Sequence, residues 1–150
     1  MPPLTPRDAL VLGQGEGFAR FRIAPTGDML FHMPLARVDH GPVVIEEDVQ
    51  ATIATTVAFA AAVLAQTDGT QRLTHFAPAV TLEEADNVVW RTQAEQDRSP
   101  NSYSMPWNSN DRAPVTLTPP TKPRAALTMD KGHMVDDLTV TLRRICKGKN

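Results

Sequence analysis

Residues 46–69 constrain the fold more than any other stretch, because they form the longest segment with a regular apolar pattern. Apolar side chains recur at intervals of three or four, which places them on one face of an α-helix. These residues are Val49, Ile53, Val57, Ala60 and Leu64. Alanines fill much of the remainder and favour helix, since alanine loses no side-chain entropy on ordering. The sequence therefore predicts one long, alanine-rich helix.

No charged residue occurs from position 49 to position 67, so a transmembrane span is one interpretation of this stretch. Gln50, Gln66 and several threonines dilute the apolar run. This favours a helix that is packed on most sides inside a domain or a subunit interface. We therefore expect no membrane partner.

Length and charge bound the class of protein. The 150 residues fit a single domain, with residues 1–7 as a flexible lead-in. Cys146 is the one cysteine and cannot form an internal disulfide, and the N-terminus lacks the pattern of a signal peptide. We therefore expect a cytoplasmic setting. A net charge of -2 gives no strong nucleic-acid signal.

The best hairpin pattern in the chain joins residues 18–24 to residues 29–33. Pro25 and Gly27 in the link have turn chemistry, because proline presets φ and glycine accepts a positive φ. Two strands connected by a tight turn are therefore predicted here.

Two arginines would share one face of this hairpin. Arg20 and Arg22 alternate with apolar residues, and side chains at alternate positions of a strand point to the same face. That face would suit an acidic partner, or phosphate in a weak nucleic-acid-binding regulatory module. A solvated face is the commoner outcome for such a pattern.

Several short segments have strand composition. They are residues 9–12, 73–76, 79–82, 115–118 and 125–128. Thr81 and Glu84 match a capping box, which favours a helix over residues 82–96 against a competing strand at 87–92.

A closing helix is predicted at residues 134–147, where apolar residues follow helical spacing and basic residues gather at the end. Together these segments predict an α+β fold. In it, a mainly antiparallel sheet packs against one long Ala-rich helix, with a Pro-rich extended arm and a C-terminal helix.

The Pro-rich arm or loop covers residues 99–124, where six prolines exclude regular helix over most of the stretch. Tyr103, Met105 and Trp107 lie within it. Exposed, they would form a partner-binding patch, because these residue types are enriched at interfaces. Folded back, they would cover the edge of the core.

Candidate chemistry is sparse. The paired carboxylates all fall near predicted helix starts, where dipole compensation explains them. His75 is the best single candidate for a proton-transfer residue, and its candidate partners are Glu83, Glu84 and Arg91. No metal-ligand spacing is recognisable, and we expect no cofactor and no bound metal.

Three functions follow from these patterns. The leading hypothesis is a non-enzymatic protein–protein interaction or assembly module. It would use the Pro-rich arm, or that arm together with the Ala-rich helix, to bind itself as a homo-oligomer or to bind another protein. The alternative is a small enzyme or small-ligand-binding domain with a pocket near His75 and Arg91. The third is the nucleic-acid module that would use Arg20 and Arg22.

Overall fold

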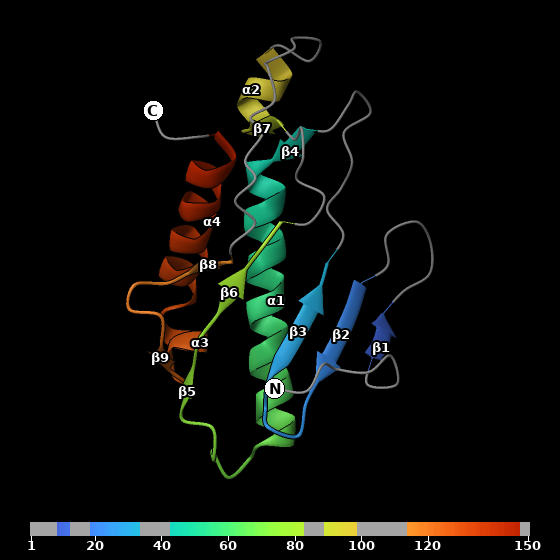
Figure 1. Ribbon diagram of the computed structural model, residues 1–150, viewed down its shortest axis with the longest axis vertical. Helices are drawn as coiled ribbons and strands as arrows, with labels where there is room; N and C mark the ends of the chain where they lie inside the picture. Colours follow the sequence, from blue (N-terminus) through green and yellow to red (C-terminus); the bar gives the residue numbers. More distant parts are fainter. Residues whose placement is uncertain (1–8, 13–18, 34–42, 83–88, 99–113, 148–150) are drawn as a thin grey trace. The chain divides into compact units, whose positions relative to one another are not determined.

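A computed structural model describes residues 9–12, 19–33, 43–82, 89–98 and 114–147. The chain divides into two compact units, Met1–Leu35 and Ala36–Asn150, and each is described by itself (Figure 1). The predicted lead-in at residues 1–7 lies outside the described residues, and the single-domain arrangement stays a prediction.

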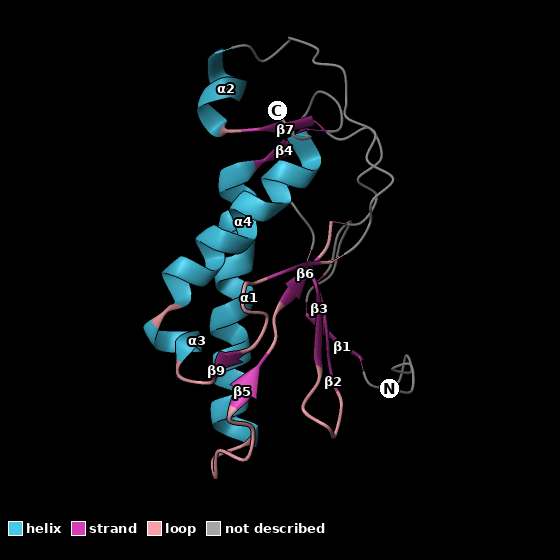
Figure 2. Ribbon diagram, turned by 60° about the vertical axis from the view of Figure 1, so that its left-hand side comes forward, coloured by secondary structure: helices cyan, strands magenta, loops and turns pink. Residues whose placement is uncertain are grey.

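The first unit holds a three-stranded antiparallel sheet in the order β1–β2–β3 (Figure 2). Its strands are β1 (Ala9–Leu12), β2 (Ala19–Ile23) and β3 (Met29–His32). β2 and β3 form the predicted hairpin, and Gly27 takes a φ of 92° in the connecting turn. Phe21 stands opposite Phe31 with ring centroids 4.9 Å apart. Stacking of this kind adds about 0.5–1.5 kcal/mol to the burial of the two rings.

The second unit is built around the predicted long helix, α1 (Glu46–Thr67). α1 lies antiparallel to α4 (Lys131–Lys147), and the short helix α3 (Ala126–Met129) completes this layer (Figures 1 and 2). α1 buries four of the five residues of its predicted apolar stripe: Val49, Ile53, Val57 and Leu64. α4 begins one turn earlier than predicted and buries a matching row. That row consists of Met134, Val135, Leu138, Thr139 and Leu142.

A parallel strand pair stands at the N-terminal end of α1. β4 (Val43–Ile45) runs directly into α1 and pairs with β7 (Val89–Arg91). The helix predicted over residues 82–96 is therefore wrong at β7, where the competing strand is correct. Val89 and Trp90 have strand-forming side chains, and pairing with β4 satisfies their backbone. Sequence alone does not show that pairing.

α2 (Gln93–Arg98) begins after β7 with a capping box of its own. The N–H of Thr92 donates to Glu95 Oε2 at 2.8 Å, and the N–H of Glu95 donates to Thr92 Oγ1 at 3.1 Å. This capping box lies eleven residues beyond the predicted one at Thr81, whose partner Glu84 lies outside the described residues.

Two short antiparallel pairs complete the second unit. β5 (His75–Phe76) pairs with β9 (Lys122–Pro123), and β6 (Ala79–Val80) pairs with β8 (Val115–Thr116). Each of these strands has two residues. β5, β6 and β8 are shorter than the segments predicted at 73–76, 79–82 and 115–118. β9 was not predicted, because it lies in the stretch assigned to the Pro-rich arm.

The strand predicted at residues 125–128 is wrong, because α3 occupies this position. A helical turn lets the adjacent Ala126 and Leu127 both be buried, whereas a strand would point them to opposite faces. The chain is thus an α+β protein with mainly antiparallel strands, one long alanine-rich helix and a C-terminal helix.

Candidate interaction surface

From Ala51 to Ala65, the face of α1 opposite its buried stripe is exposed and uncharged. We call this surface the open face of α1. Its exposed residues are Ala51, Thr55, Ala58, Ala62 and Ala65. They recur at intervals of four, three, four and three residues, so they form one row along the helix. All five side chains are small, which allows another backbone to approach closely.

The composition of the open face is unusual for a helix with only one buried stripe. Such a helix normally carries charged residues on its outer side. α4 follows this rule, since Asp137 and Arg144 are exposed. Beyond its first turn, where Glu47 is exposed, α1 does not follow it, although both helices bury comparable rows in the same layer. Packing within the second unit therefore does not account for the composition of the open face.

Threonine hydroxyls beside the open face are turned inward to the helix backbone. Thr52 Oγ1 donates to the carbonyl of Asp48 at 2.7 Å, and Thr56 Oγ1 donates to the carbonyl of Thr52 at 2.8 Å. These bonds satisfy the hydroxyl protons locally. The helix surface is consequently less polar than its threonine content suggests.

By length and composition, α1 is also able to cross a membrane, and no other helix in the described ranges is. This criterion alone is weak, because the core helix of a soluble protein meets it as well.

α1 is joined to α4 by polar contacts near its N-terminal end. Arg143 Nη1 lies 2.9 Å from Glu46 Oε1, and Gln50 Nε2 donates to Asp136 Oδ1 at 2.5 Å.

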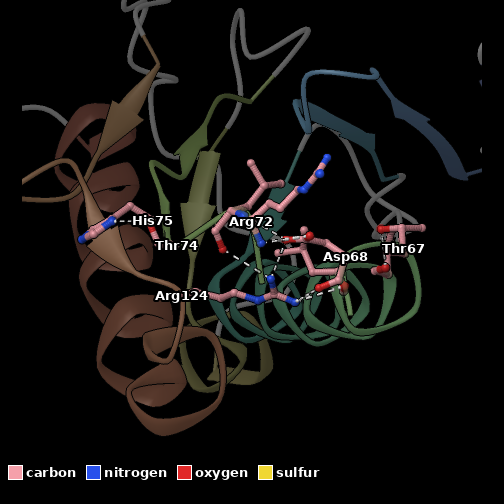
Figure 3. Close-up of polar contacts among 9 residues, drawn as sticks. Thr67, Asp68, Arg72, Thr74, His75 and Arg124 are labelled. Atoms are coloured by element: carbon pink, nitrogen blue, oxygen red, sulfur yellow. Dashed lines mark hydrogen bonds and ion pairs between the residues drawn. The ribbon is translucent and has the colours of Figure 1, made fainter. Parts of the chain in front are cut away.

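Arg124, which lies between β9 and α3, contacts the C-terminal end of α1 (Figure 3). Arg124 Nη1 lies 2.7 Å from Asp68 Oδ2, and Arg124 Nη2 donates to the carbonyls of Leu64 and Asp68 at 3.1 and 3.2 Å. The last carbonyls of a helix have no partner within it, and a cation there also complements the helix dipole. Arg124 thus caps α1 and joins it to the segment before α3.

Asp68 organises the loop that follows α1. Its Oδ2 accepts from the N–H of Leu73 at 2.9 Å, and its Oδ1 accepts from the N–H of Arg72 at 3.0 Å. The Leu73 bond is the largest influence that lowers the pKa of Asp68 below its ordinary value of 3.8. The Arg72 bond and the Arg124 guanidinium lower it further, and partial burial opposes them.

Stability should therefore depend on the ionisation of Asp68. Because folding lowers this pKa, the contribution is fully present above the ordinary value and is lost as the pH falls through the folded value. Asp68→Asn should lower the melting temperature at neutral pH, and the difference from the parent should shrink as the pH falls below the ordinary value of 3.8. Thermal unfolding at several pH values measures this. Asp137→Asn, at an exposed carboxylate on α4, is the control. A difference for Asp68→Asn that stays constant down to acidic pH would contradict this role.

Arg91 and His75 do not share a site. Arg91 is buried in β7 and donates from Nη1 to Gln96 Oε1 at 3.0 Å. His75 is exposed in β5, with Nδ1 2.9 Å from Thr74 Oγ1. β7 adjoins the N-terminal end of α1 and β5 follows its C-terminal end, and a helix of 22 residues is about 33 Å long (Figure 1). The structure thus separates the two residues predicted to line one pocket.

The other candidate residues lie apart from α1 in the sequence. Arg20 and Arg22 share a face of β2 as predicted, with His32 and Leu30 directly opposite them on β3. Tyr103, Met105 and Trp107 lie outside the described residues.

Two further groups bear on chemistry. Burial raises the pKa of the Cys146 thiol, which disfavours the nucleophilic thiolate. In the described ranges, histidine, cysteine and carboxylate side chains form no group of three or more that would hold a metal ion.

Sequence reasoning named the Ala-rich helix as an interaction element but did not pick out the open face. The signal was present, because the five exposed residues repeat with a period of seven. No family model, curated protein or solved structure matches the chain. Among the described residues, the open face of α1 is the surface whose composition most needs an explanation.

Proposed function

We propose that the protein is a non-enzymatic assembly module, and that a second copy of the chain packs against the open face of α1. The observation that carries this proposal is the uncharged row of small residues on the exposed side of a long helix. Charged side chains on a helix face in contact with water keep their hydration. Charged side chains buried against a partner helix would lose it at a cost in free energy, so a partner helix favours an uncharged face.

The spacing of the row favours a helix as the partner. A period of seven residues keeps a row in contact with a second helix at a shallow left-handed crossing. Small side chains bring the two backbones close, so that the helices gain dispersion contacts along their length.

The order of the residues favours a second copy of the same helix. The row has alanine at its centre, Ala58, and at both ends, Ala51 and Ala65. Two antiparallel copies related by a twofold axis through Ala58 would place Ala51 of each opposite Ala65 of the other. Such an isologous contact is the commonest arrangement in homodimers.

The expected association is weak. One helix pair is a small interface, at or below the low end of about 1,200 Å² for specific complexes. The arm residues Tyr103, Met105 and Trp107 would add contact area if they join the assembly.

The same proposal includes a cytoplasmic setting. Membrane insertion of α1 would take the exposed charges of α4 toward hydrocarbon or would separate the two helices.

Charge substitutions at Ala58 test the proposal. Ala58→Glu and Ala58→Lys should each remain folded, because both residues are good helix formers and the site is exposed. Each variant alone should be monomeric, since like charges would meet at the twofold axis. An equimolar mixture of the two should associate again, because opposite charges then meet. Light scattering gives the masses, and circular dichroism checks the fold.

Ala94→Glu and Ala94→Lys provide the matched control, because Ala94 is an exposed helical alanine outside α1. These variants should keep the mass of the parent. Loss of association in the control variants, or an unchanged mass in both Ala58 variants, would exclude the open face as the contact. Failure of the mixture to associate would exclude the twofold arrangement.

A further inference from the structure

We draw no further inference here: the strongest candidate, the indole Nε1 of Trp90, which is buried in β7 without a hydrogen-bond partner beside the buried Arg91, carries nothing because nothing in the described part of the chain shows a ligand or a cavity toward which that nitrogen points.

Discussion

Replacing Met134 by alanine is expected to lower the free energy of unfolding by about 2–5 kcal/mol, which is the usual cost of deleting a fully buried side chain. Met134 is 1% exposed and lies in α4, in the helix layer formed with α1 and α3. The substitution removes apolar contacts and leaves a cavity that a close-packed interior fills only in part. Urea unfolding monitored by circular dichroism measures the change.

Met129 provides the matched control for this experiment. It carries the same side chain in the same unit, but it is 85% exposed at the end of α3. Met129→Ala should change the free energy of unfolding by no more than about 0.5 kcal/mol, as expected for a surface substitution. Equal effects of the two substitutions would mean that α4 does not pack against α1 as described.

Arg124→Met should also destabilise the fold, by on the order of 2 kcal/mol from the hydrogen bonds that its charged group makes to backbone carbonyls. Arg124 contacts the carbonyls of Leu64, Asp68 and Leu73 as well as the Asp68 carboxylate. Methionine keeps much of the apolar stem and removes all of these bonds. The end of α1 and the loop after it should therefore loosen together.

Hydrogen exchange resolves this local effect. In Arg124→Met, the amide hydrogens of Asp68, Arg72 and Leu73 should exchange faster than in the parent. Arg144→Met is the control, because Arg144 is exposed in the last turn of α4. Unchanged exchange after α1 in Arg124→Met would show that Arg124 does not hold this end of the helix.

The elements that the sequence predicted well are those with a local pattern. The apolar stripe of α1, the buried row of α4 and the turn at Gly27 each follow from residue types that lie close together in the sequence. Burial on one face of a helix requires a helical period, and glycine adopts a positive φ without the steric cost that a Cβ brings, so these features follow from residue type and spacing.

The elements that sequence reasoning missed depend on distant partners. β4 and β7 are separated by all of α1 and pair in parallel, which no local pattern shows. Residues 125–128 read as a strand, yet they form α3, because Ala126 and Leu127 are both buried. Tertiary packing decides between helix and strand for such short apolar runs.

The same distinction applies to the candidate site. Asp68 and Arg124 lie 56 residues apart in the sequence, so their ion pair was not predictable. The open face could have been predicted, because its five residues repeat with a period of seven in the sequence. It became recognisable only when the structure showed which face of α1 is buried. His75 and Arg91 were grouped by chemistry alone, and the structure separates them.

The most direct test of the assembly proposal is the mass of the intact chain in solution, measured by light scattering from micromolar to near-millimolar concentration. We expect the mass to rise with concentration from 16.4 kDa toward twice that value, as a weak homodimer requires. A mass that stays at 16.4 kDa up to the highest concentration would contradict self-assembly through α1.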